Sequence, residues 1–299
     1  MAKILITGSS GFIAPHVVNS ALKKNFKVYG IDKLDNDNKV EGCNYIKEDI
    51  NNFDLSKIKN LDYIVHLAFD TNIPHSIKEP KDTTENNLLM TLNLLKQATE
   101  NKIKKFIFSS TASLYGHNPI PWVENMLSDP LEPYGWQKLS GESLCTMWHK
   151  CYGLPTSTLR LYQVYGENQR KDTALALFIR LKKEKKPITL TETSPGSDCK
   201  TGRRDFIYVG DVADAFIANC ESEKTGKGEI INIATGRMTS MQEVAETIGG
   251  EVKFIPKRGF EVESHQADLS QCNRLLNWKP KVNFLSWLDK FAKDQEKND

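Results

Sequence analysis

The chain has 299 residues, enough for one large domain or two of medium size. Its 40 Lys and Arg nearly balance its 38 Asp and Glu, and the resulting net charge of +2 favours neither nucleic acid nor a membrane surface as a partner. With 39% hydrophobic and 26% charged residues, the composition excludes collagen-like and largely disordered chains and is typical of a globular protein.

The compartment is predicted from three further features of the chain. No apolar run approaches the ~20 residues that span a bilayer, and the N-terminus lacks the apolar core of a signal peptide, so we expect a cytoplasmic protein. The six cysteines form no CxxC pair, which favours reduced thiols over a disulfide framework. The six histidines show no HExxH or HxxxH spacing, so no metal site is predicted.

The first half of the chain alternates strand-like and helix-like stretches. Short β-branched runs predict strands at 3–7, 27–32, 63–68 and 104–110, and amphipathic stretches predict helices at 13–24, 84–101 and 134–152. Such alternation is typical of a parallel sheet with helices on both faces.

The pattern weakens after Gly166. A strand-like run at 155–166 is followed by a helix at 173–185, a strand at 187–191, a polar loop at 191–202, strands at 204–209 and 229–235, and a Lys-rich tail. We therefore predict an α/β fold, a doubly wound parallel sheet with a smaller α+β cap. The first domain covers 1–166 with 204–235 returning to it, and the second covers 167–203 and 236–299.

A glycine-rich turn links the first strand to the first helix. Gly8 permits the tight turn, Gly11 lets the backbone approach a pyrophosphate, and the small Ala14 lets the helix pack on the strand. The second strand ends in Asp32, where a carboxylate can accept the ribose hydroxyls of a dinucleotide. This context favours a dinucleotide site over a purely structural turn. Asp32 would repel a 2′-phosphate and so favours NAD, although Lys33 beside it leaves NADP open.

Tyr134 and Lys138 are four residues apart on one predicted helix face. We expect the ammonium to lower the pKa of the phenol from about 10 toward neutrality, which would make Tyr134 a base. A Tyr-x-x-x-Lys pair is common on helices. Its position after a dinucleotide turn and after the hydroxyl-rich stretch 109–111 favours the catalytic interpretation.

Together these motifs resemble the extended short-chain dehydrogenase/reductases, and within them the NAD-dependent nucleotide-sugar epimerase and dehydratase family, closest in motifs to members that resemble UDP-glucose 4-epimerase. The matching segments follow the family order over nearly the whole chain: TGSSGFIA (7–14), HLA (66–68), FSSTASLYG (108–116), PYGWQK (133–138), LRLYQVYG (159–166), RRDFIYVGDVADAF (203–216) and NIATGRMTS (232–240). The resemblance implies an NAD-binding Rossmann domain, a substrate-binding domain for a nucleotide-diphosphate sugar, and a homodimer formed through helices 84–101 and 134–152.

The resemblance also assigns roles to individual residues. The implied cofactor contacts comprise the pyrophosphate turn, the ribose and adenine edge, and the nicotinamide side: Gly8, Gly11, Phe12, Ile13, Asp32, Asp49, Ile50, Leu67, Ala68, Asn87 and Lys138. The implied catalytic residues are Thr111, Tyr134 and Lys138. The implied substrate contacts, which include two arginines for the diphosphate, are Thr111, Tyr134, Gln163, Thr191, Arg204, Arg258 and His265.

Departures from the family pattern narrow the reaction. Dehydratases of the family carry an Asp-Glu pair after the catalytic Thr, where this chain has Ala112 and Ser113. Elimination is therefore disfavoured, and so is decarboxylation, which is usually accompanied by Glu at the second of these positions. Gln163 replaces a common Asn, Thr191 replaces an aromatic residue, and His265 is neither the usual large Tyr nor a small Cys or Ser. These three changes leave the sugar and the nucleotide base open.

The function we expect is C4 epimerisation of a nucleotide-diphosphate sugar, with a UDP-hexose as the leading candidate. Tyr134 as phenolate would remove the 4-hydroxyl proton and return it after NAD has taken up the C4 hydride and the sugar has turned. Two alternatives stay open. The first is an NAD(P)-dependent oxidoreductase, either a 4-keto-sugar reductase or another extended short-chain dehydrogenase such as the threonine dehydrogenases. The second is a non-catalytic dinucleotide-binding protein.

Overall fold

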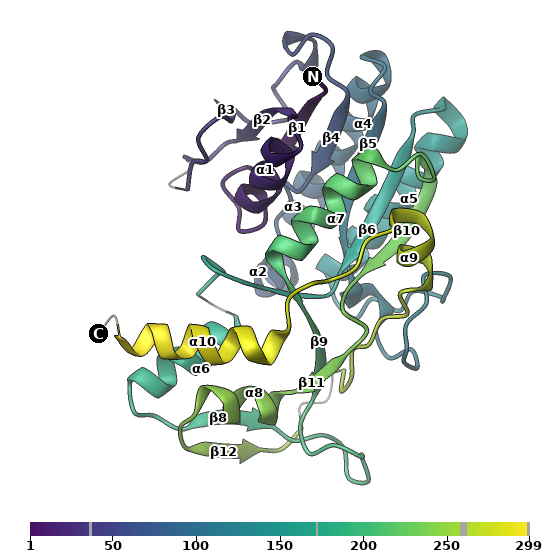
Figure 1. The fold of residues 1–299 in the computed structure, drawn as a ribbon. Coiled ribbons are helices and arrows are strands. Elements are labelled where there is room, and N and C mark those ends of the chain that lie inside the picture. The colour runs from purple at the N-terminus through teal and green to yellow at the C-terminus, as the bar shows by residue number, and fades with distance from the viewer. Residues whose placement is uncertain (36–37, 172, 258–261, 298–299) are drawn as a thin grey trace.

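A seven-stranded parallel sheet forms the larger part of the molecule (Figure 1). The computed structural model describes residues 1–35, 38–171, 173–257 and 262–297. The strands are β1 (Lys3–Thr7), β2 (Lys27–Asp32), β3 (Asn44–Lys47), β4 (Tyr63–His66), β5 (Lys105–Thr111), β6 (Thr156–Leu161) and β10 (Lys227–Ile233). They lie in the order β10-β6-β5-β4-β1-β2-β3, and each neighbouring pair is parallel. This confirms the predicted fold class.

The order of the strands places a crevice at the end of β1. The chain runs outward from β1 to β2 and β3 on one side and to β4, β5 and β6 on the other. Parallel α/β sheets bind ligands at such a point of reversal, beyond the carboxyl ends of the strands.

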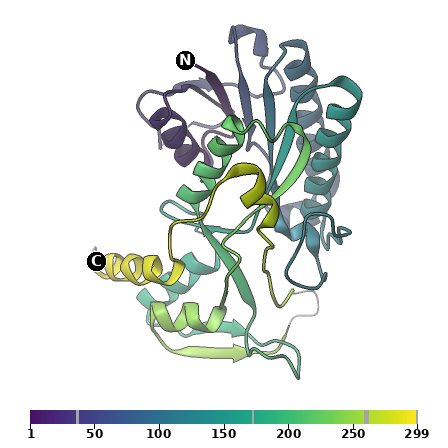
Figure 2. The same cartoon turned by 45° about the vertical axis from the view of Figure 1, so that its right-hand side comes forward.

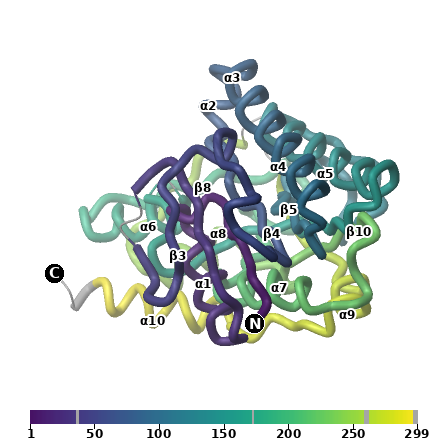
Figure 3. The backbone as a smooth tube through the Cα atoms, turned by 90° about the horizontal axis from the view of Figure 1, so that it is seen from above, coloured from purple at the N-terminus to yellow at the C-terminus, as the bar shows by residue number. Residues whose placement is uncertain are grey.

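Helices cover both faces of the sheet (Figure 3). On one face α1 (Ala14–Lys23) packs against α7 (Val209–Glu221), and their apolar side chains share one core cluster with β1 and β6. On the other face α4 (Met90–Glu100) packs against α5 (Pro133–Tyr152), and both contribute to a second cluster. The predicted single helix 84–101 consists of the end of α3 (Pro80–Thr84), a π-helical turn η2 (Glu85–Leu89) and α4.

The smaller part of the molecule lies beyond the carboxyl ends of the large sheet (Figure 2). It holds a three-stranded sheet, β11-β9-β7, and a two-stranded parallel sheet, β12-β8. Its elements are β7 (Gln163–Tyr165), α6 (Ala174–Lys183), β8 (Ile188–Thr191), β9 (Arg203–Tyr208), β11 (Met238–Ser240), α8 (Met241–Ile248), β12 (Val252–Ile255) and α10 (Phe284–Lys297). A third core cluster holds it together, with Phe206 stacked on Phe284 at 4.0 Å between ring centroids.

Four features of the fold differ from the sequence-based expectations. The strand-like run 155–166 divides into β6 in the large sheet and β7 in the small one. β9 pairs with β7 and β11, so the chain returns to the large sheet only with α7 and β10. β3 was not predicted, because its four residues lie at the sheet edge and alternate poorly. The Lys-rich tail is helical as far as Lys297.

The sequence predicted reduced cysteines and no membrane-spanning segment. All six cysteines are free thiols. Within the described ranges, none of the helices combines the length and the apolar character needed to cross a bilayer.

Candidate active site

The glycine-rich turn lies against the end of β4. Gly8 has φ of +70°, and a Cβ atom there would lie 2.8 Å from the backbone nitrogen of Ala68. The N–H of Gly11 donates to the carbonyl of Gly8 at 3.0 Å and closes the turn. α1 then begins behind Ile13 with no capping side chain and no acidic residue in its first turn. Its first N–H groups and the positive end of its dipole therefore suit a diphosphate.

Gly8→Ala should destabilise the protein and weaken NAD binding together. The left-handed backbone costs a non-glycine residue about 1–3 kcal/mol in free energy of unfolding, and the added methyl group also pushes against the backbone of Ala68. Urea unfolding and NAD titration measure the two effects. Gly153→Ala is the matched control, because Gly153 has φ of +71° but no atom within 4 Å of a Cβ there. It should cost stability and leave NAD binding unchanged, and equal NAD affinity in the two variants would contradict the assigned role of Gly8.

The adenosine end of the site is formed by β2 and β3. The carboxylate of Asp32, the last residue of β2, accepts from the N–H of Ser10 at 3.0 Å and from the N–H of Leu34 at 2.9 Å. These two hydrogen bonds hold the carboxylate of Asp32 beside the glycine-rich turn. Asp49 and the buried Ile50 follow β3 on the neighbouring strand. The structure thus brings together the residues predicted for the ribose and the adenine.

A hydrogen-bonded chain through buried His66 connects the turn to the nicotinamide side. The hydroxyl of Thr7 accepts from the N–H of Ala68 at 3.1 Å and lies 2.8 Å from Nδ1 of His66. Nε2 of His66 lies 3.1 Å from the hydroxyl of Thr91, which donates to the carbonyl of Asn87 at 2.8 Å. Because Thr91 uses its hydrogen on Asn87, it accepts from Nε2 of His66. The hydroxyl of Thr7 donates to Nδ1, and we therefore assign the ring proton to Nε2. Sequence reasoning missed this chain, although a histidine in an apolar strand was a signal for it.

The burial of His66 predicts acid sensitivity. Burial lowers the pKa of His66 from 6.5 to about 3, with a smaller contribution from Lys138. Between these pH values only the unfolded chain binds the proton, so stability is complete above pH 6.5 and falls as the pH drops toward 3. The free energy of unfolding should lose at most about 1.4 kcal/mol per pH unit from this group.

Urea unfolding from pH 7 to 4 measures this effect. His66→Asn should show a shallower dependence on pH than the wild type, whereas His117→Gln, at an exposed position, should keep the wild-type slope. An unchanged slope in His66→Asn would exclude His66 as the source.

Asn87 joins the π-helical turn to α5. Its side-chain oxygen accepts from the N–H of Asp70 at 2.7 Å, and its Nδ2 donates to Oε1 of Gln137 at 2.8 Å. Gln137 is fully buried, and its Nε2 donates to the hydroxyls of Thr83 and Thr84, each at 3.0 Å. These bonds fix the start of α5, where two predicted catalytic residues lie, against the segment that carries Asn87.

Thr111 and Tyr134 meet at the end of β5. Thr111 is the last residue of β5, and its hydroxyl caps the short helix η3 (Ala112–Tyr115) by accepting from the N–H of Ser113 at 3.2 Å. Tyr134 is the second residue of α5, whose N-terminus is capped by Glu132. A hydrogen bond joins the phenol to Thr111. The structure therefore brings together the predicted hydroxyl pair.

The sequence-based expectation that Lys138 lowers the pKa of Tyr134 is not met in the structure. Nζ of Lys138 donates to the carbonyl of Ser109 at 2.7 Å and lies 3.6 Å from the ring centroid of Phe69, but 6.0 Å from that of Tyr134. Burial raises the pKa of Tyr134 to about 12, opposed by the hydrogen bond with Thr111. Burial also lowers the pKa of Lys138 to about 7. The expected lowering of the phenol pKa by Lys138 is wrong for this arrangement, because the ammonium lies toward Ser109 and Phe69.

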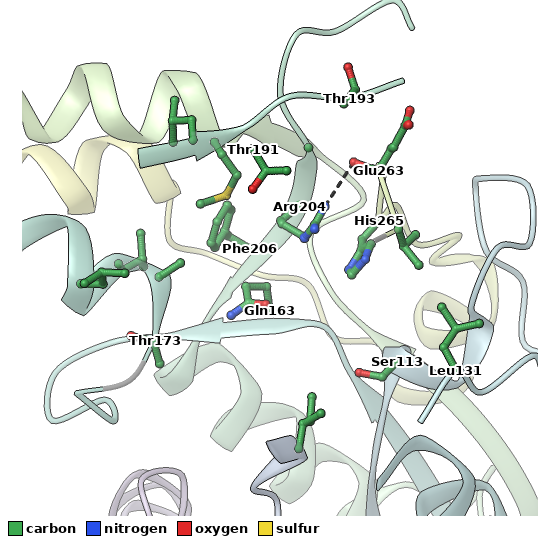
Figure 4. A pocket seen from close by; sticks show the side chains of 18 of the residues that line it. Ser113, Leu131, Gln163, Thr173, Thr191, Thr193, Arg204, Phe206, Glu263 and His265 are labelled. Carbon is green, nitrogen blue, oxygen red and sulfur yellow. Dashed lines mark hydrogen bonds between the residues drawn. The ribbon is translucent and has the colours of Figure 1, made fainter. Parts of the chain in front are cut away.

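A cavity of about 850 Å³ opens between the two parts of the molecule (Figure 4). Four predicted substrate residues line it: Gln163, Thr191, Arg204 and His265. Ser113, Glu132 and Pro133, sequence neighbours of Thr111 and Tyr134, line the same cavity. Arg258 lies outside the described residues.

Arg204 contributes positive charge to one wall of the cavity, and much of the rest is apolar. Arg204 donates to the backbone carbonyls of Arg203 at 2.9 Å and Glu263 at 3.2 Å, which fixes its guanidinium at the cavity wall. Burial and the nearby Arg204 lower the pKa of His265, whose ring packs on Trp122 at 4.9 Å. The apolar lining includes Leu131, Leu175, Phe178, Leu190 and Phe206.

Sequence reasoning missed one ion pair at this wall. Lys257 and Glu263 approach to 2.6 Å, and the carboxylate also accepts from the backbone and side chain of Ser194. Hydrogen bonds from Lys257 and Ser194 lower the pKa of Glu263 to about 2. The two charged residues are six positions apart, and their hydrogen bonds with Ser194 connect them to a loop more than sixty positions away, which no local pattern indicates.

Comparisons with known proteins agree with this geometry. Residues 4–234 match the model of the NAD dependent epimerase/dehydratase family. The UDP-glucuronate 4-epimerase of Thermodesulfobacterium geofontis is 31% identical over 94% of this chain and 92% of its own. The UDP-N-acetylglucosamine 4-epimerase of Methanobrevibacter ruminantium, solved with UDP-N-acetylmuramic acid, superposes with a TM-score of 0.88 at 31% identity and covers 100% of this chain and 99% of its own.

A further solved relative carries the cofactor. The UDP-glucuronic acid 4-epimerase of Bacillus cereus, solved with UDP-glucuronic acid and NAD, has a TM-score of 0.87 at 33% identity and covers 98% of this chain and 99% of its own. The family match, the coverage of both chains and the dinucleotide turn lead to one conclusion: the chain belongs to the NAD-dependent epimerase/dehydratase family.

Proposed function

We propose that the protein is an NAD-dependent epimerase that inverts C4 of a nucleotide-diphosphate sugar, with a UDP-hexose as the leading substrate. One observation carries the proposal. Tyr134, hydrogen-bonded to Thr111, contacts Phe69, which follows Ala68 at the end of β4. The sequence neighbours of the two hydroxyl residues, Ser113, Glu132 and Pro133, line the cavity that also contains Arg204. Related proteins of this length and fold are named as UDP-sugar 4-epimerases.

The chain offers NAD a site that fits it. The uncapped start of α1 and the turn at Gly8 suit the pyrophosphate, and Asp32 suits the adenosine ribose. Leu67, Ala68 and Asn87 would border the nicotinamide, and Lys138 would bind its ribose. When bound there, NAD supplies reversible acceptance of the C4 hydride.

The residues of the chain supply the proton transfer and the clamp. Tyr134 takes the proton of the 4-hydroxyl and returns it, and Thr111 orients that hydroxyl. Because burial raises the pKa of Tyr134, the phenolate needs positive charge beside it, which the oxidised nicotinamide would provide. Arg204 suits the diphosphate because a guanidinium binds phosphate oxygens in pairs. Because Arg204 would hold the diphosphate, the sugar could turn about it and present either face of C4 to the nicotinamide.

The choice of epimerisation over elimination or decarboxylation rests on the residues after Thr111. Ala112 is buried and carries no acid, and the hydroxyl of Ser113 accepts from Thr111 at 3.1 Å. Neither residue can act as the acid or base that loss of water or carbon dioxide from the sugar requires.

A panel of sugar nucleotides tests the proposal. Purified protein with added NAD is incubated with UDP-, dTDP-, GDP- and ADP-sugars, and products are separated by mass and by chromatography that resolves epimers. A product of unchanged mass identifies the substrate and supports the proposal. Loss of water or carbon dioxide would overturn it, and accumulation of NADH in solution would indicate a net oxidoreductase instead.

We also propose a homodimer formed through α4, α5 and η2. Large apolar side chains exposed on these adjacent elements include Leu89, Trp136 and Met147, at 54, 48 and 38% of their full area. A second copy would bury them. Light scattering should give twice the chain mass for the wild type and the chain mass for the double variant Trp136→Arg, Met147→Arg. A monomeric wild type would exclude the dimer.

The predicted domain division and the predicted cytoplasmic location are also kept as proposals. Residues 167–203 and 236–299 would act as the substrate-binding domain, supported by the position of Thr191 and His265 in the cavity wall. Location in the cytoplasm stays a prediction.

A further inference from the structure

We propose that Phe69 is a positioning residue that fixes the ammonium of Lys138 and the phenol of Tyr134 relative to each other. Phe69 follows β4 in the loop before α2 (Ile73–Lys78), next to Ala68. Its ring face meets Nζ of Lys138 at 3.6 Å from the centroid. The same ring meets that of Tyr134 edge-on, with centroids 6.2 Å apart and planes at 77°. The inference rests on the catalytic roles of Tyr134 and Lys138 in the proposed function.

The surroundings of Lys138 show why an aromatic ring matters. The side chain is 2% exposed, and it donates to the carbonyl of Ser109 at 2.7 Å. The ammonium also faces the rings of Phe69 at 3.6 Å and Phe108 at 5.0 Å. A desolvated cation is attracted to the negative face of an aromatic ring. Phe69 therefore helps to keep the proton on Lys138 and keeps the ammonium beside the start of α5.

Other titratable groups near Lys138 come from two elements. His66 of β4 is neutral, since burial and the ammonium both lower its pKa. Glu142 and Cys145 lie further along α5 itself, and their electrostatic effect on Lys138 is weaker than that of burial. None of these groups contacts both catalytic side chains, whereas Phe69 contacts Lys138 and Tyr134.

The contact with Tyr134 completes the geometry. Edge-to-face aromatic pairs prefer a perpendicular arrangement at this separation, so the ring of Phe69 limits the tilt of the phenol. Phe69 thus acts through the two catalytic groups. It belongs to the β4 end that would border the nicotinamide, and so it ties the position of both groups to the cofactor edge.

Fluorinated phenylalanines at position 69 test the inference. Fluorine weakens the negative face of the ring and leaves its shape nearly unchanged, so the series separates charge attraction from packing. In the cofactor-free protein, ¹⁵N NMR of the lysine ammonium, assigned by comparison with Lys138→Met, reports the pKa of Lys138. We expect this pKa to fall with each added fluorine, by about one unit for the fully fluorinated ring. Phe69→Leu should show a similar fall.

The holoenzyme gives the functional readout. The alkaline limb of the plot of kcat against pH should move to lower pH in parallel with the NMR titration, because the protonated Lys138 is the active form. The same fluorination at Phe216, buried in the cluster of α1 and α7, should leave both readouts unchanged. Identical titrations across the Phe69 series would overturn the inference. If no sugar nucleotide is turned over while the NMR series responds, the proposed function fails and the contact between Phe69 and Lys138 stands.

Discussion

Tyr134→Phe is expected to reduce kcat by at least about a hundredfold and to leave thermal stability close to that of the wild type. The hydroxyl hydrogen-bonds to Thr111 beside the cavity, and the ring keeps its contact with Phe69 in the variant. Only the group that moves the proton is lost. Steady-state turnover on the substrate found in the panel, with circular dichroism melting, measures both effects.

Tyr152→Phe is the matched control for this variant, since Tyr152 lies exposed at the end of the same helix. It should keep wild-type turnover. NAD affinity should be retained in Tyr134→Phe, because the pyrophosphate turn and Asp32 are untouched. Near-normal turnover in Tyr134→Phe would remove Tyr134 from the proton transfer and with it the proposed mechanism.

Glu142→Ala should cause the largest loss of stability, about 3–5 kcal/mol in free energy of unfolding. Glu142 of α5 and Arg160 of β6 form an ion pair at 2.7 Å with both side chains 2% exposed. Ser110 donates to the same carboxylate, and the guanidinium also lies over the ring of Tyr115 at 4.7 Å. Removal of the carboxylate leaves a buried guanidinium without its counterion. Urea unfolding measures the loss.

The double variant Glu142→Ala, Arg160→Met tests the cause. It removes both charges, so it should lose less stability than Glu142→Ala although it changes two buried residues. A larger loss in the double variant would show that packing, rather than the uncompensated charge, dominates at this position.

The fold was predictable from sequence where local patterns decide it. β1 and β2 have the bounds predicted from their apolar runs, and α5 begins one residue before its predicted start because Pro133 suits a first turn. The division of 155–166 into β6 and β7 was not predictable. Both halves are equally strand-like, and the pairing of β7 with β9 joins residues about forty positions apart in the chain.

In the site, too, the features set by local sequence were predictable and those set by distant contacts were not. The dinucleotide turn and the pair Tyr134 and Lys138 follow from motifs and spacing. Spacing on a helix, however, does not say which way an ammonium points. The position of Lys138 beside Phe69 depends on how the segment after β4 meets α5 in the folded chain, and so the predicted pKa of Tyr134 was wrong. The hydrogen bonds of Lys257 and Glu263 with Ser194 depend in the same way on loops that meet only in the folded chain.

The most direct test of the central claim follows a label at C4 of the sugar. The protein with NAD is given the substrate found in the panel, deuterated at C4, and the products are analysed by mass and by NMR. The account predicts an epimer that keeps its mass and its deuterium at C4. Loss of the label to solvent or to free reduced cofactor, or a product without inversion at C4, would contradict epimerisation at this site.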